Sequence, residues 1–208
     1  MPRSPRRCGA ARKPRAARTA ARAGSEGIAE IAYALLDAPV GRLVVAATSC
    51  GLVCIAYELE NGGVDGVLDQ IAERLSPSIV EAPARLDGAR RELDDYFAGR
   101  RRTFDVEIDW RLARPGFTRR ILEATARIPF GETRSYRDVA IAAGSPNAFR
   151  AAGGALGSNP IPIVVPCHRV LASDGRIGGY TGGLERKRIL LGIEGAAGVA
   201  QLTLPAVP

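Results

Sequence analysis

The sequence predicts an α+β domain followed by a mainly α-helical domain that contains a helix-turn-helix. With 208 residues, the chain is long enough for one large domain or two small ones. Short β-like runs and two helical patterns fill the first half, whereas helical patterns dominate after Trp110. We therefore expect domains at residues 28–110 and 111–196. Hydrophobic residues make up 46% of the chain, but none of its apolar runs reaches the roughly 18 residues of a membrane span.

The first domain is expected to contain a small antiparallel sheet and two helices. Its β-like runs are residues 31–36, 43–48, 52–57 and 104–108. The turns between the first three runs are short enough for antiparallel hairpins. Apolar residues recur at helical spacing over 64–75 and again over 86–97, which predicts two amphipathic helices. No catalytic constellation is visible in this half.

The second domain begins with an amphipathic helix over 117–128, which Pro129 and Gly131 should end. Ser135 and Asp138 have the spacing of a capping box, in which each side chain bonds the other residue's backbone N–H. This pair predicts a helix that starts after Ser135 and ends near Gly144.

A further helix is predicted from Asn147 to about Gly157, with Ser145 as its cap and Pro146 in its first turn. Two short helices joined by a Gly-Ser turn form a candidate helix-turn-helix. Residues 151–155 of the second helix are only Ala and Gly, and the two adjacent glycines cost about 2 kcal/mol of helix propensity relative to alanine. This composition favours close approach of another surface, either a neighbouring helix or a nucleic-acid groove.

Charge is distributed unevenly along the chain, whose net charge is +7. Residues 1–25 have a net charge of +8, residues 26–110 of −8 and residues 111–150 of +5. The first 27 residues are expected to form a disordered basic tail, and residues 197–208 a flexible C-terminal tail. A polyanionic partner should meet the basic 111–150 segment, although a solvated charged face is an equal alternative.

The four cysteines, at positions 8, 50, 54 and 167, lack the spacing of a disulfide framework. This pattern suggests a reducing, cytoplasmic location. A zinc site at Cys50 and Cys54 would be short of ligands, because the chain has one histidine. These two cysteines are expected to be small core residues.

Cys167 differs from them because it follows the apolar run 161–165 and directly precedes His168. Burial should raise the pKa of this thiol, whereas an adjacent imidazole offers a base for its proton. Glu194, near the end of a helix that starts at Leu184, could orient the imidazole. A core cysteine beside an incidental histidine is the alternative interpretation.

Residues 165–170, VPCHRV, resemble the active-site signature of the O6-alkylguanine-DNA alkyltransferases. The resemblance extends over residues 115–195, whereas the front half matches only loosely. Its other motifs are Phe130–Thr133, Ser135-Tyr136, Arg150-Ala151, Gly153-Gly154, Asn159-Pro160, Gly178–Gly183 and Glu194-Gly195.

This resemblance implies a ribonuclease H-like N-terminal domain, a winged helix-turn-helix-like C-terminal domain, and single-use DNA repair. Cys167 would accept the alkyl group from O6-alkylguanine, with O4-alkylthymine as a further candidate substrate. His168 would remove the thiol proton through a water, Glu194 would hold His168, and Asn159 would brace the turn. The target base must be flipped out of the duplex for this reaction.

The resemblance also implies a set of DNA- and base-binding residues. Arg150 would fill the gap left in the duplex, and Tyr136 would crowd a phosphate and hydrogen-bond the purine. Tyr180 and Thr181 would line the guanine pocket, together with the backbone carbonyls of Cys167 and Val170. The complete implied set is Ser135, Tyr136, Arg150, Ala151, Gly153, Val170, Tyr180 and Thr181.

Two residues depart from the family pattern: Thr181 stands where many members have serine, and Phe149 stands where a small residue is usual. The resemblance implies a monomer that acts on double-stranded DNA without a metal or other cofactor. One alternative is a non-catalytic sensor of alkylated DNA or a transcription regulator, which would not need Cys167. Another is a Cys-His hydrolase, which would turn over an ester or amide.

Overall fold

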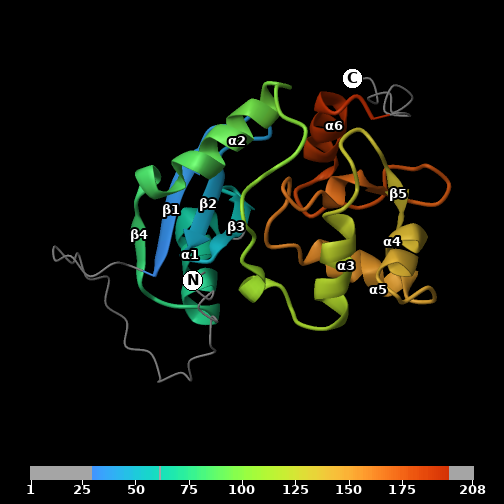
Figure 1. Ribbon diagram of the computed structural model, residues 1–208, viewed down its shortest axis with the longest axis horizontal. Helices are drawn as coiled ribbons and strands as arrows, with labels where there is room; N and C mark the ends of the chain where they lie inside the picture. Colours follow the sequence, from blue (N-terminus) through green and yellow to red (C-terminus); the bar gives the residue numbers. More distant parts are fainter. Residues whose placement is uncertain (1–29, 61, 197–208) are drawn as a thin grey trace, which may run out of the picture.

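The computed structural model describes residues 30–60 and 62–196, and its first domain is built on a four-stranded sheet (Figure 1). The strands are β1 (Ile31–Leu36), β2 (Leu43–Thr48), β3 (Gly51–Tyr57) and β4 (Ile79–Glu81), in the order β3-β2-β1-β4. The three predicted hairpin strands are confirmed, and they pair antiparallel. The sheet as a whole is mixed rather than antiparallel, because β4 pairs parallel to β1.

The predicted strand over 104–108 is wrong. A single parallel bridge joins Ile108 to Leu52, with backbone hydrogen bonds from Leu52 to Glu107 and from Asp109 to Leu52. This segment crosses from the first domain toward the second after α2 (Figure 1).

Two helices cover opposite faces of the sheet. Val67 and Ile71 of α1 (Gly63–Arg74) pack with Val44 and Cys54 on one face. Leu93 and Tyr96 of α2 (Asp87–Phe97) join a larger core on the other face. A 3-10 turn, Pro83–Leu86, leads into α2. Since that larger core continues into the second domain, it connects α2 with the C-terminal half.

The second domain is mainly helical, as predicted. Its helices are α3 (Phe117–Thr125), α4 (Tyr136–Ala142), α5 (Phe149–Gly157) and α6 (Leu184–Ile193). Two short strands, β5 (Arg134–Ser135) and β6 (Val170–Leu171), form a parallel pair beside them. Helices α4 and α5 pack together as the two halves of the predicted helix-turn-helix (Figure 1).

Local signals at the ends of α4 and α5 had different outcomes. The capping box is confirmed, since the Ser135 hydroxyl accepts from the Asp138 N–H at 3.1 Å and the Asp138 carboxylate accepts from the Ser135 N–H at 2.9 Å. The predicted cap at Ser145 is wrong, because α5 starts at Phe149 and has Ala148 at its N-cap. Ser145 instead closes a backbone turn by accepting from the Ala148 N–H.

Cys54 is a free, buried thiol, as expected of a small core residue. Cys50 is half-buried, so the expectation of a core position is wrong for this residue. The predicted tails at 1–27 and 197–208 lie outside the described residues.

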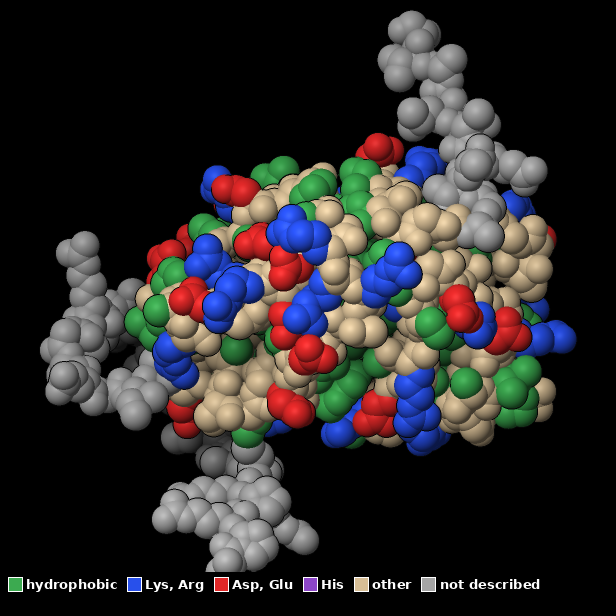
Figure 2. Space-filling model, turned by 45° about the horizontal axis from the view of Figure 1, so that its top comes forward, with side chains coloured by type: hydrophobic (Ala, Val, Ile, Leu, Met, Phe, Trp, Pro, Cys, Tyr) green, Lys and Arg blue, Asp and Glu red, His purple; other side chains and the backbone are tan. Residues whose placement is uncertain are grey.

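Over the described part of the chain, every helix is too short or too polar to cross a membrane. Acidic and basic side chains intermix on the face shown in Figure 2. The acidic and basic parts of the sequence therefore do not form separate negative and positive surfaces on this face.

Candidate active site at Cys167

Cys167 lies at the start of a 3-10 turn, Cys167–Arg169, that follows the buried segment 161–166. Its side chain is buried and free. The Asn159 amide donates to Cys167 Sγ at 3.1 Å and to the Val165 carbonyl at 2.8 Å, and it accepts from the Ile161 N–H at 3.0 Å. Asn159 therefore contacts both ends of the segment that presents the thiol.

His168 and Glu194 form a buried pair behind the thiol. His168 Nε2 lies 2.8 Å from Glu194 Oε1, and both side chains are fully shielded from solvent. The other ring nitrogen, Nδ1, has no hydrogen-bond partner within the described residues although it is buried. Because a buried polar atom normally has a partner, this nitrogen marks a position for a water or a reacting group.

Two more buried cations surround this pair. Arg169 donates from Nε to Glu194 Oε2 at 2.8 Å and from Nη2 to Glu194 Oε1 at 2.9 Å. Lys187 of α6 donates from Nζ to the Val170 carbonyl at 2.6 Å and to the Gly179 carbonyl at 3.3 Å. Lys187 thus links the segment after Cys167 to the glycine-rich loop, residues 178–183.

Burial and the neighbouring polar or charged groups shift the pKa values of these side chains in opposite directions. Burial raises the pKa of the Cys167 thiol, while the Asn159 hydrogen bond and the Lys187 charge lower it. Burial lowers the pKa of His168, against the pull of Glu194, so the imidazole is neutral at pH 7. Burial likewise lowers the pKa of Lys187 to about 8. Burial alone would raise the pKa of Glu194, but its bonds to His168 and Arg169 hold that pKa at about 2.

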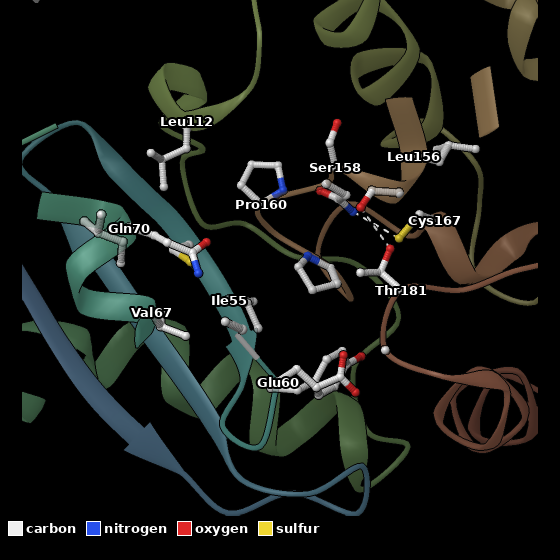
Figure 3. Close-up of a pocket in the computed structure, with 18 of the residues that line it drawn as sticks. Ile55, Glu60, Val67, Gln70, Leu112, Leu156, Ser158, Pro160, Cys167 and Thr181 are labelled. Carbon is white, nitrogen blue, oxygen red and sulfur yellow. Dashed lines mark hydrogen bonds between the residues drawn. The ribbon is translucent and has the colours of Figure 1, made fainter. Parts of the chain in front are cut away.

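Cys167 lines two adjoining cavities. One, of about 390 Å³, is bordered by Tyr136, Gly153 and Gly179. The other, of about 260 Å³, extends from Cys167 between the domains toward Val67 and Gln70 of α1 (Figure 3). The residues common to both linings are Leu156, Gly157, Cys167, Tyr180 and Thr181. A reactant at the sulfur could therefore extend in two directions.

The predicted pocket residues surround these cavities, but several are already hydrogen-bonded. The Tyr180 hydroxyl lies 2.7 Å from that of Tyr57, and the Thr181 hydroxyl donates to the Gly157 carbonyl at 2.9 Å. The Ser135 hydroxyl is engaged in the capping box. The Val170 carbonyl already accepts from Lys187, which leaves one of its two lone pairs for a ligand.

The outer face of α5 carries Arg150, the residue predicted to fill the gap left in the duplex by the extruded nucleotide. Arg150 and Ala151 are exposed, and Gly153 faces the Tyr136 ring, which a Cβ would approach to 3.8 Å. Phe149, one of the two departures from the family pattern, contacts two arginines through its ring. The guanidinium carbons of Arg137 and Arg150 lie 5.6 and 5.7 Å from its ring centre.

Sequence reasoning missed four residues of this site: Tyr57, Tyr96, Arg169 and Lys187. Tyr57 and Tyr96 belong to the first domain, where no motif marked them. Arg169 is a buried charged residue that directly follows His168, and Lys187 occupies the buried face of α6 three residues before Leu190. A charged residue at a position that the pattern assigns to the core was the available signal for both.

The fold and the site together define a class of protein in which a helix-turn-helix domain carries a buried cysteine beside an imidazole–carboxylate pair. Two family models match it: the 6-O-methylguanine DNA methyltransferase ribonuclease-like domain over residues 31–110, and the DNA binding domain of the same proteins over residues 116–196. The chain belongs to the 6-O-methylguanine DNA methyltransferase family.

Individual relatives agree with this assignment. A methylated-DNA–protein-cysteine methyltransferase of Mycolicibacterium paratuberculosis is 41% identical over 174 residues, which cover 84% of this chain and 98% of that protein. One from Methanosarcina barkeri is 35% identical over 78% of this chain and 96% of its own.

Solved structures show the same fold. The crystal structure of Mycobacterium tuberculosis OGT in complex with DNA has a TM-score of 0.68 and 39% identity, covering 82% of this chain and 98% of that one. An O6-methylguanine-DNA methyltransferase from Pyrococcus kodakaraensis has a TM-score of 0.56 and 28% identity, covering 80% of this chain and 99% of that one.

Proposed function

We propose that this protein repairs DNA by moving an alkyl group from O6 of guanine to Cys167. The observation that carries the proposal is the position of Cys167, which lines two adjoining cavities and lies directly before the buried His168–Glu194 pair. One cavity offers room for an extruded base, and the other for the group attached to it. The activity named for the relatives is the reaction that this arrangement suits.

The chemical step is a nucleophilic displacement at carbon. His168 takes the thiol proton through a water at Nδ1, the thiolate forms a bond to the alkyl carbon, and the carbon–O6 bond breaks with its electrons on guanine. The proton held by His168 returns to the purine that leaves. Glu194 orients the imidazole and stabilises its protonated form.

Duplex DNA containing the lesion is the proposed partner, with α5 in a groove of the duplex. Its exposed Ala151 and Gly154 allow close approach of the backbone, while Arg150 takes the place of the extruded nucleotide. Tyr136, Tyr180 and Thr181 border the space for the purine. The carbonyl of Val170, which accepts from Lys187, is a further proposed contact for the purine.

A thioether at Cys167 is stable to the groups around it, so each molecule acts once. We further propose that the protein works as a cytoplasmic monomer, with residues 28–110 as scaffold and residues 111–196 as the DNA-binding and acceptor domain. Ser135, Ala151 and Gly153 shape the α4–α5 surface that meets the DNA.

The test is the mass of the protein after mixing with a duplex that carries one O6-methylguanine. We expect one added methyl on the peptide that contains Cys167, saturating at one per molecule and absent from Cys167→Ala. Binding of the duplex without a gain in mass would instead support a non-catalytic sensor. Repeated turnover would contradict the single-use reaction.

A further inference from the structure

Tyr96 connects the first domain to the acceptor site through one hydroxyl group. The residue lies in the last turn of α2 and is fully buried. Its hydroxyl donates to Glu194 Oε1 at 2.7 Å, across 98 positions of sequence. Glu194 Oε1 is also the atom that contacts His168.

The Glu194 carboxylate accepts five hydrogen bonds, whereas its two oxygens offer about four lone pairs. Oε1 accepts from Tyr96, His168 and Arg169, while Oε2 accepts from Arg169 and from the Gly131 N–H at 3.3 Å. Because an sp² oxygen has two lone pairs, three donors on Oε1 share its electron density. Removing one of them changes how strongly the other two are held.

The ring of Tyr96 is packed independently of that hydroxyl. It meets Phe97 and Phe104 with centroids at 5.4 and 5.3 Å, and it meets Phe130 of the second domain edge-to-face at 6.1 Å. A phenylalanine at this position would keep all three ring contacts. The hydroxyl is therefore separable from the role of the ring in joining the domains.

We propose that Tyr96 is a positioning residue for the acceptor site, which holds Glu194 so that His168 is correctly oriented and correctly basic. The first domain thereby takes part in activating Cys167. This inference rests on the proposed function for the role of His168 as the base. The link from Tyr96 through Glu194 to His168 rests on the contacts alone.

Tyr96→Phe tests this link because the chain contains one histidine. In a protein without a histidine tag, the ¹⁵N shifts of the two ring nitrogens between pH 5 and pH 9 report the tautomer and charge of His168 alone. The charged groups that face this ring are Glu194, Arg169 and Lys187. With one donor fewer, Glu194 attracts the imidazolium more strongly, so the protonated fraction at pH 5 should increase.

The same variant should slow methyl transfer. We expect a decrease of about fivefold at pH 7, with the acid limb of the rate profile moved to higher pH, because general-base catalysis contributes about 10²–10⁴ and the base remains present. In a Glu194→Gln background, Tyr96→Phe should add nothing, since a residue that acts through Glu194 loses its effect without that carboxylate.

Leu93→Ala is the matched control for loss of stability, because Leu93 is buried on the same helix and lies outside the contacts of Glu194. It should lower the unfolding temperature and leave the ring-nitrogen shifts of His168 unchanged. If Tyr96 only stabilises the fold, Tyr96→Phe should likewise lower the unfolding temperature without changing the His168 shifts. Ring-nitrogen shifts identical to those of the unmodified protein at every pH would therefore overturn the inference. Altered shifts in a protein that never accepts a methyl group would uphold the link and overturn the proposed function.

Discussion

The Tyr57 hydroxyl lies 2.7 Å from the Tyr180 hydroxyl, although the two residues are 123 positions apart. Tyr57 ends β3 of the first domain, and Tyr180 belongs to the glycine-rich loop that borders both cavities. The Arg186 guanidinium lies over the Tyr57 ring, 4.4 Å from its centre. The first domain thus forms the surface on which this loop rests.

Gly182→Ala should displace the loop and slow transfer about a hundredfold. A Cβ at this position would overlap the Tyr57 ring and come 2.8 Å from Tyr180, closer than packed side chains allow. The rate of methyl transfer from duplex DNA is the measurement. Gly192→Ala on α6 is the matched control, because a Cβ there meets no neighbour within 4 Å. Equal rates for both variants would contradict the tight fit.

Asn159→Asp should raise the pH at which the Cys167 thiol ionises and becomes reactive. The change removes the amide donor that lowers the pKa of this buried thiol and places a carboxylate beside it, so the thiolate forms at higher pH. The rate of thiol alkylation by iodoacetamide against pH measures the shift without DNA. Asn147→Asp, at an exposed position, should leave the curve unchanged. A midpoint at lower pH in Asn159→Asp would be inconsistent with this geometry.

Acidification should destabilise the fold in two stages. The pKa of His168 is depressed by burial, so the unfolded chain binds a proton below about pH 6.5 that the folded protein binds only at lower pH. The pKa of Glu194, ordinarily 4.5, is held at about 2, so its contribution of about 3 kcal/mol is present above pH 4.5 and is lost toward pH 2. Both groups therefore reduce stability as pH falls.

Denaturant unfolding at pH 7 and pH 3 checks the second stage. Glu194→Gln should be less stable at pH 7, because it leaves Arg169 buried without its partner, but should lose less stability between the two pH values. An undiminished acid dependence in Glu194→Gln would assign that loss to other carboxylates.

Gln70→Trp should discriminate between lesions by size. Gln70 lines the interdomain cavity at the side away from Cys167 (Figure 3). A larger side chain there should leave methyl transfer within about twofold and slow transfer of an extended para-substituted benzyl group about tenfold, since overpacking costs about 1–3 kcal/mol. Asp69→Trp, an exposed neighbour outside the lining, is the control. Equal slowing of both substrates would argue against this cavity as the site of the transferred group.

Arg150→Ala should slow transfer from duplex DNA more than transfer from a free modified base. The side chain is exposed on α5 and supported by Phe149, where it could replace an extruded nucleotide but has no role once the base is free. Relative rates on the two substrates are the measurement, with Arg100→Ala in the first domain as control. Equal slowing on both substrates would contradict the wedge.

Much of the fold could be predicted because its signals are local. The hairpin strands and the capping box of α4 depend on residues within a few positions of one another, and all are confirmed. Strand β4 was missed because its three residues are too few for a pattern, and they pair with β1 across 48 positions. The 104–108 segment alternates like a strand, but it meets the sheet through one bridge.

The site shows the same division. Asn159, Cys167 and His168 lie within ten positions, so their arrangement followed from the motif, whereas Tyr57 and Tyr96 reach the site through tertiary packing alone. Whether each residue acts as the resemblance implies stays a prediction. A charged side chain such as Lys187 on an otherwise apolar helix face is the kind of local inconsistency that points to a functional position.

Because Tyr57 and Tyr96 contact residues of the second domain, the acceptor site contains side chains from both domains. A fragment that begins after residue 110 would keep the signature hexapeptide, the histidine and the glutamate. It would lack the Tyr96 hydroxyl that bonds Glu194 and the Tyr57 hydroxyl that contacts Tyr180. Two separately produced fragments, joined by fused partners that associate, would restore those contacts only when the partners meet. We expect that a chain cut between its domains would be alkylated at Cys167 only where the two fused partners associate. The permanent thioether would then report that the partners had met.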